Sequence, residues 1–127
     1  MLRVLIADDH EIVRRGLKQV LLDEFAFLTV AEVGDAIELI KKCNEQEWDI
    51  VISDLFMPGG GGFAALKVIK EKMPHLPVLI LSIYPEEQYA LRVLKAGASG
   101  YLNKDAAGSE LVKAIGQILS GKKYMSR

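Results

Sequence analysis

The sequence predicts an α/β fold in which a five-stranded parallel sheet is covered by helices on both faces. Short, almost continuous apolar runs alternate five times with longer segments whose apolar residues recur at helical spacing. Nearly continuous apolar strands are typical of parallel sheets that lie beneath helices on both sides. With 127 residues, of which 50% are hydrophobic and 26% charged, the chain is long enough for one domain with a substantial core.

Each predicted strand is a short apolar run. The first, RVLIAD, has the character of a buried strand, whereas the second, LTVAEV, has the mixed polarity that suits a sheet edge. The predicted strands are residues 3–8, 28–33, 49–54, 77–82 and 99–104.

Each predicted helix is a longer amphipathic segment. The second helix is expected to place Ile37 and Ile40 inward, with Leu39 beside them. Acids stand in the first turn of the fourth helix and Gly97 at its C-terminal cap, and Gly121 closes the fifth. The predicted helices are residues 10–24, 35–46, 63–73, 85–97 and 108–120.

Composition and charge exclude several classes of protein. A net charge of -1 and a pI near 6.1 give no overall basic field that would hold nucleic acid by charge alone. Cys43 is the single cysteine, so a disulfide framework and a cysteine metal site are excluded. The first apolar run is too short for a signal peptide, and no run approaches the length that crosses a bilayer. A cytoplasmic protein without membrane association is therefore expected.

The C-terminal residues predict a domain boundary. The segment GKKYMSR follows the last predicted helix and has the character of a linker. We expect one domain over residues 1–121, with residues 122–127 beginning a linker.

Polar residues stand at the carboxyl ends of four predicted strands. Asp8 and Asp9 end the first strand, and Asp54 ends the third. Ser82 ends the fourth and Lys104 the fifth. Each residue alone has an ordinary structural use, such as a helix cap or a solvated surface position. Together they indicate a site, because in open parallel sheets functional groups collect at the carboxyl ends of the strands.

The residue types at this edge favour phosphoryl chemistry with a divalent cation. Three neighbouring carboxylates repel one another unless a cation intervenes, and Mg²⁺ prefers such oxygen ligands. Zinc is disfavoured, since His10 and His75 have no ligand partners at useful spacing in the sequence. A carboxylate can also attack phosphorus and form an aspartyl phosphate. The Lys104 ammonium and the Ser82 hydroxyl would then bind the phosphoryl oxygens.

The four glycines at residues 59–62 allow a competing interpretation. GGGGFA fits the dinucleotide-binding pattern G-x-G-x-x-[GA]. That pattern should follow the first strand, and the next strand should end in an acid, whereas here it ends in Ser82. The glycines are better explained as a tight turn beside a metal and a phosphate.

Four segments resemble the receiver domain of two-component response regulators over residues 2–121. These segments are LIADDH, VISDLFMPGGGG, VLILS and AGASGYLNKD. ADDH combined with GYLNKD is further similar to the NarL/FixJ subfamily, whose receivers precede a LuxR-type helix-turn-helix DNA-binding domain. The resemblance implies a flavodoxin-like fold with strand order 2-1-3-4-5.

The resemblance also implies roles for individual residues. Asp54 would be the phosphoacceptor, Lys104 would stand at the family's invariant lysine, and Mg²⁺ would be held by side chains and one backbone carbonyl. Ser82 and Tyr101 would be the switch residues, and Phe56 and Tyr84 would flank the path of the hydrolytic water. The implied Mg²⁺ ligands are Asp8, Asp9, Asp54 and the carbonyl of Phe56. Asp105 departs from the proline that commonly follows the lysine.

We therefore expect a phosphorylatable signalling switch rather than a metabolic enzyme. A sensor histidine kinase would donate the phosphoryl group, and the chain would catalyse its own phosphorylation and a slow dephosphorylation. Phosphorylation would favour a homodimer, and DNA would be bound only through a further C-terminal domain.

Two rival hypotheses come from other classes. A flavin-binding or metabolic enzyme could use the same sheet edge, but DDHEI at residues 8–12 would repel a flavin phosphate that lacked a metal. A pseudo-receiver that only binds proteins predicts the loss of an acid or of the lysine, and none is missing.

Overall fold

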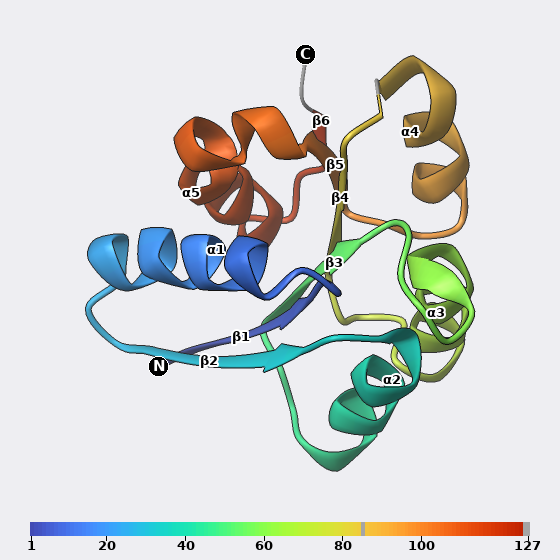
Figure 1. Cartoon of the computed structure of the whole chain (residues 1–127), viewed down its shortest axis with the longest axis horizontal. Helices are drawn as coiled ribbons and strands as arrows, with labels where there is room; N and C mark the ends of the chain where they lie inside the picture. The colour runs from blue at the N-terminus through green and yellow to red at the C-terminus, as the bar shows by residue number, and fades with distance from the viewer. Residues whose placement is uncertain (85, 126–127) are drawn as a thin grey trace.

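A six-stranded parallel sheet forms the centre of the computed structural model (Figure 1). The structure describes residues 1–84 and 86–125, and for residues 86–88 it describes the backbone alone. The strand order is β2-β1-β3-β4-β5-β6, so the predicted order 2-1-3-4-5 is confirmed and gains one strand. The strands are β1 Leu2–Ala7, β2 Leu28–Val33, β3 Ile50–Asp54, β4 Val78–Ser82, β5 Gly100–Asn103 and β6 Tyr124–Met125.

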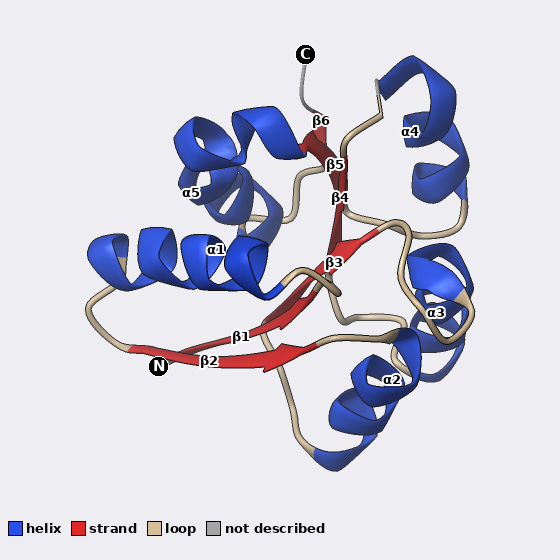
Figure 2. Ribbon diagram, viewed as in Figure 1, coloured by secondary structure: helices blue, strands red, loops and turns tan. Residues whose placement is uncertain are grey.

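Five helices connect the strands and cover both faces of the sheet. Figure 2 shows the first and last helices, α1 and α5, on one face and the other three on the opposite face. All five predicted helices are present, although Pro85, the expected start of the fourth, lies outside the described residues. The helices are α1 Glu11–Glu24, α2 Ala36–Glu45, α3 Gly61–Lys72, α4 Glu86–Lys95 and α5 Ala107–Leu119, with a 3₁₀ turn at Lys104–Ala106. None of the described helices is long and apolar enough to cross a membrane.

The core consists of two apolar layers, one on each face of the sheet. Successive side chains of a strand point to opposite faces. Leu5 and Val51 therefore pack with residues of α2, α3 and α4, whereas Ile6 and Ile52 pack with residues of α1 and α5. Every residue of β3 and β4 is buried, as expected for central parallel strands.

The sixth strand corrects the five-strand prediction. Two residues of the segment expected to be a linker, Tyr124 and Met125, pair in parallel with β5. The Tyr124 ring is buried, and its hydroxyl donates a hydrogen bond to the Glu110 carboxylate. Burial, and to a lesser extent the contact with Glu110, raises the pKa of Tyr124 to about 12. The expected domain boundary at residue 121 stays a prediction, and residues 126 and 127 lie outside the described part of the chain.

The buried face of α2 differs from the predicted one. Ala36, Leu39 and Cys43 face the core, whereas Ile37 is 69% exposed and Ile40 only partly buried. Residues at i, i+3 and i+7 share one side of a helix, and this set excludes position 37. The expected inward position of Ile37 is therefore wrong.

The run of glycines forms a turn that leads into α3 two residues earlier than predicted. Gly59, Gly60 and Gly61 have φ values of 84°, 105° and 83°, which side chains strongly disfavour. Gly62 is required for another reason: a Cβ atom there would lie 2.0 Å from the backbone oxygen of Asp54. The turn therefore presses the start of α3 against the end of β3.

Replacing Gly62 by alanine should destabilise the protein by about 1–3 kcal/mol, because the added methyl group must displace the backbone after Asp54. The matched control is Gly116→Ala in α5, where a Cβ atom would meet nothing within 4 Å. That change should stabilise by about 0.5–1 kcal/mol through helix propensity. Denaturant unfolding measures both, and equal stabilities for the two variants would contradict the close packing at Gly62.

Candidate functional site

The carboxyl ends of β1, β3, β4 and β5 bring the predicted site residues to one edge of the sheet. Asp8 directly follows β1, Asp54 ends β3, Ser82 ends β4, and Lys104 follows β5 in the 3₁₀ turn. The chain leaves β1 for α1 on one face and leaves β3 for α3 on the other. The site therefore lies where the connections diverge, which is where open α/β sheets form a crevice.

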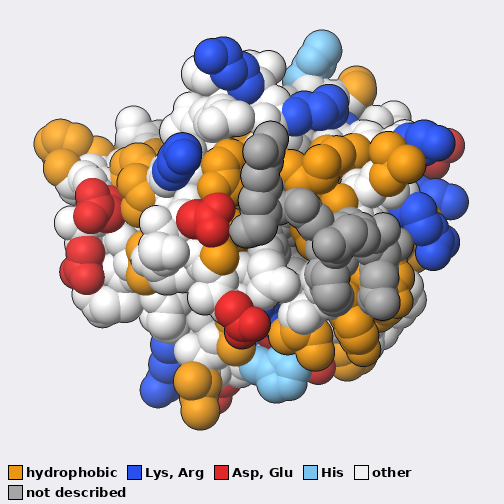
Figure 3. Space-filling view, turned by 90° about the horizontal axis from the view of Figure 1, so that it is seen from above, with side chains coloured by type: hydrophobic (Ala, Val, Ile, Leu, Met, Phe, Trp, Pro, Cys, Tyr) orange, Lys and Arg blue, Asp and Glu red, His pale blue; other side chains and the backbone are white. Residues whose placement is uncertain are grey.

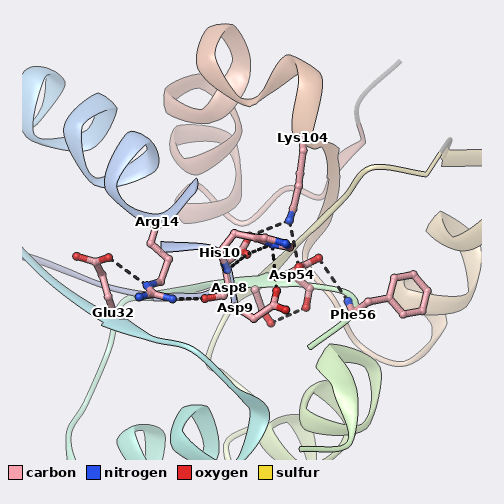
Figure 4. Close-up of polar contacts among 9 residues, drawn as sticks. Asp8, Asp9, His10, Arg14, Glu32, Asp54, Phe56 and Lys104 are labelled. Atoms are coloured by element: carbon pink, nitrogen blue, oxygen red, sulfur yellow. Dashed lines mark hydrogen bonds and ion pairs between the residues drawn. The ribbon is translucent and has the colours of Figure 1, made fainter. Parts of the chain in front are cut away.

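Lys104 joins two of the carboxylates. Its Nζ lies 2.8 Å from Asp8 Oδ2 and 3.0 Å from Asp54 Oδ2, and its side chain is only 14% exposed (Figure 4). Burial opposes the charge of Lys104, but its contacts with the Asp8 and Asp54 carboxylates outweigh burial and raise its pKa. The lysine is therefore held as a cation at the centre of the site.

The carboxylates carry more negative charge than this lysine can balance. Asp8 and Asp54 are buried, and Asp9 lies at the surface beside them. Burial raises the pKa of Asp54, and the negative charge of Asp8 adds to this effect, while Lys104 opposes it. The site is thus short of positive charge.

The donor set fits a hard divalent cation. Ligand atoms of Asp8, Asp9, His10 and Asp54 all lie within 4.8 Å of one another. Asp8 Oδ2 is buried without a well-directed hydrogen bond, although Lys104 Nζ is close to it. Carboxylate oxygens with free lone pairs are the ligands that Mg²⁺ and Ca²⁺ prefer. The cluster could therefore bind a metal ion.

His10 contacts two of the carboxylates of the site. Its Nδ1 lies 3.2 Å from Asp8 Oδ1 and 3.1 Å from Asp9 Oδ1, and its side chain is 67% exposed. His10 therefore makes local polar contacts with its sequence neighbours, and the fold adds Asp54 to the same cluster. Carboxylates still outnumber the imidazole, so the set remains dominated by oxygen.

The two predicted switch residues contact the same backbone segment. Ser82 Oγ is buried and accepts a hydrogen bond from the Tyr84 N–H at 3.0 Å. Tyr101 is fully buried, and its hydroxyl donates to the Tyr84 carbonyl at 2.9 Å. Tyr84 thus connects the hydroxyl at the site with the aromatic ring in β5.

Three aromatic rings cluster beside the site. Phe56 and Tyr84, which are 50% and 40% exposed, meet edge to face with ring centroids 5.4 Å apart. Tyr89 completes the cluster at 5.5 Å from Phe56 and 5.4 Å from Tyr84. The Phe56 ring points away from the carboxylates, whereas its backbone N–H donates to Asp54 Oδ1 at 3.4 Å (Figure 4). The expected metal contact of the Phe56 carbonyl stays a prediction.

Sequence reasoning missed Tyr89, Arg14 and Glu32. Tyr89 lies on the helix that follows Tyr84, a spacing that could have suggested contact. Arg14 donates to the backbone of Asp8 and contacts Glu32, 18 residues away. Nothing in the sequence pattern indicated that pairing.

The chain is similar to a known protein family and to a longer bacterial protein. The response regulator receiver domain family matches residues 4–116. The response regulator UvrY of Escherichia coli (strain K12) is 36% identical over 126 residues, which cover 99% of this chain and 58% of UvrY. The chain thus spans less than two thirds of that relative.

Solved structures give the same grouping. A LuxR-family two-component response regulator from Aurantimonas sp. SI85-9A1 matches with a TM-score of 0.92 at 38% identity, over 98% of this chain and 89% of that one. A structure of two RcsB dimers bound to two parallel DNAs matches with a TM-score of 0.90 at 31% identity, over 99% of this chain and 64% of that one. Fold and sequence therefore agree.

Replacing Asp54 by asparagine should stabilise the metal-free protein at neutral pH. The fold raises the pKa of Asp54, so its favourable contribution is complete below the unfolded-state pKa and is lost as pH rises through the folded-state pKa. The advantage of the variant should shrink as pH falls toward the ordinary value of 3.8. Urea unfolding in the presence of a chelator, across this pH range, measures the difference.

Asp23→Asn is the control for this experiment. Asp23 is exposed and accepts a hydrogen bond from Gln19 at the end of α1. Its replacement should change stability by less than about 0.5 kcal/mol. An Asp54→Asn protein that is no more stable than wild type at neutral pH would contradict the excess of negative charge.

Proposed function

The chain belongs to the response regulator receiver domain family, and on that premise we propose that Asp54 accepts a phosphoryl group from a sensor histidine kinase. The observation that carries the proposal is the contact of Lys104 Nζ with both Asp8 and Asp54, beside the further carboxylate of Asp9. A buried nucleophile, a fixed cation and spare acidic ligands together suit phosphoryl transfer, which depends on positioning and charge neutralisation.

The transfer exchanges one bond to phosphorus for another. A carboxylate oxygen of Asp54 forms a bond to phosphorus while the bond between phosphorus and the kinase imidazole breaks, and the electron pair of the broken bond stays on the imidazole nitrogen. Mg²⁺, held by Asp8, Asp9 and Asp54, would supply positive charge to the phosphoryl oxygens. Lys104 leaves its contact with Asp54 Oδ2 to bind a phosphoryl oxygen, and the Phe56 N–H holds Oδ1.

The proposed switch runs through Tyr84. A phosphoryl oxygen on Asp54 would draw the Ser82 hydroxyl toward it and compete with the hydrogen bond from the Tyr84 N–H. Movement of Tyr84 would in turn break the bond between its carbonyl and the Tyr101 hydroxyl. The face formed by α4, β5 and α5 then has two arrangements, and phosphorylation shifts their populations.

We place the output outside the described residues. UvrY is longer than this chain, and RcsB binds DNA as dimers. By analogy, phosphorylation would favour a homodimer and regulate transcription through a C-terminal DNA-binding domain, in the cytoplasm. On the face drawn in Figure 3, basic and acidic side chains are scattered among apolar ones.

Incubation with Mg²⁺ and a small phosphodonor should add one phosphate-sized increment to the intact mass of the wild-type protein. Asp54→Asn should abolish the increment, whereas Asp23→Asn should retain it. Lys104→Met keeps the nucleophile but removes the fixed cation, so its phosphorylation should be about 100-fold slower. A full increment in Asp54→Asn, or none in wild type, would refute the assignment.

The lifetime of the phosphorylated state should be controlled by Phe56 and Tyr84. Phe56 has no polar group to align a water, and the bulky ring of Tyr84, despite its hydroxyl, would obstruct the path of the water. The two rings pack edge to face beside the site. Phe56→Asn and Tyr84→Glu should therefore speed hydrolysis, and a tenfold change would correspond to about 1.4 kcal/mol of barrier.

A phosphate-release time course measures this effect. The control is Phe27→Asn, because Phe27 is 75% exposed and precedes β2. β2 forms one edge of the sheet, and β4 and β5 lie toward the other edge. Unchanged or slower hydrolysis in both site variants would show that the rings do not guard the phosphate.

A further inference from the structure

Arg14 holds the backbone of Asp8 from outside the acidic cluster. Its Nη1 donates to the Asp8 carbonyl oxygen at 2.5 Å, and its Nε donates to Glu32 Oε1 at 3.2 Å (Figure 4). The Asp8 N–H donates to the Val33 carbonyl at 3.1 Å. Both backbone groups of Asp8 are therefore fixed, one by the strand ladder and one by Arg14.

The contact joins three elements of the fold. Arg14 lies in the first turns of α1, Glu32 lies near the end of β2, and Asp8 lies in the turn after β1. The Arg14 and Glu32 side chains are only 18% and 25% exposed, so the pair is largely shielded from water. A guanidinium donates in a rigid planar fork, which allows it to bind the carboxylate and the carbonyl together.

The positive charge of Arg14 opposes metal binding at the neighbouring carboxylates. A cation beside the carboxylates of Asp8 and Asp9 lowers their attraction for a divalent metal ion. Arg14 would still favour metal binding if its positioning of the Asp8 backbone increases the affinity more than its charge reduces it. Charge and positioning therefore predict effects of opposite sign when Arg14 is removed.

We propose that Arg14, held by Glu32, is a positioning residue for the divalent-cation site. It fixes the turn at residues 8–10 so that the carboxylates of Asp8 and Asp9 stay within reach of Asp54. Arg14 does not touch the metal ion and acts only through the Asp8 backbone. The inference rests on the proposed Mg²⁺ site.

The test is calorimetric titration of the metal-free protein with Mg²⁺. Arg14→Met should weaken binding about tenfold, as is typical when a group that orients a metal ligand is lost. Arg14→Lys should also weaken it, because an ammonium keeps the charge but lacks the fork. Arg15→Met is the matched control: Arg15 neighbours Arg14 on α1, pairs with Glu11 at the surface, and should leave Mg²⁺ affinity unchanged or slightly higher.

A double-mutant cycle tests whether the two residues act together. If Glu32 works by holding Arg14, Glu32→Gln should weaken Mg²⁺ binding less in the Arg14→Met background than in wild type. Thermal unfolding without metal separates this effect from a loss of stability. If Arg14→Met fails to fold, Arg14→Lys provides the same reading.

The outcomes distinguish the inference from the proposed function. Wild-type protein that binds Mg²⁺, with Arg14 variants that bind equally or more tightly, would overturn the positioning role and leave the proposed function intact. Wild-type protein that does not bind Mg²⁺ would overturn the proposed site itself. Weaker binding in both Arg14 variants, with Arg15→Met unaffected, supports the inference.

Discussion

The crowding of negative charge at the carboxyl end of the sheet is the constraint on which the site depends. Asp8 and Asp54 are buried at the carboxyl ends of the neighbouring strands β1 and β3, and Lys104 contacts both. One ammonium cannot neutralise these groups together with Asp9, so the cluster could take up a further cation. The same imbalance is the basis of the proposed phosphoryl chemistry at Asp54, which needs positive charge at the moment of transfer.

The surrounding structure holds this crowded arrangement in place. Gly62 allows α3 to pack directly on the Asp54 carbonyl, and Arg14 fixes the Asp8 carbonyl from the opposite side. Both contacts are made to backbone atoms, so they set the direction of each carboxylate without using its oxygens. The carboxylates thereby remain available for Lys104 and a metal ion.

The link from the site to the far side of β5 is short. The Tyr84 carbonyl accepts a hydrogen bond from the Tyr101 hydroxyl, and the Tyr84 N–H donates one to Ser82. These two hydrogen bonds connect the edge that carries Asp54 with the core of the α4-β5 region. β6 then pairs Met125 with Tyr101. The strand that carries the Tyr101 ring is therefore also the strand with which the C-terminal residues Tyr124 and Met125 pair.

The sequence by itself determined the five predicted strands, the five helices and the site residues at the strand ends. Local periodicity encodes these features, and parallel strands necessarily bring their carboxyl ends to one edge. Only the tertiary structure decided which face of α2 is buried, the pairing of β6, the contact of Tyr89 with Phe56 and the Arg14–Glu32 pair. Each of these depends on contacts between segments distant in the chain, for which short-range patterns carry no signal: Arg14 and Glu32 meet because α1 and the end of β2 pack around the same turn.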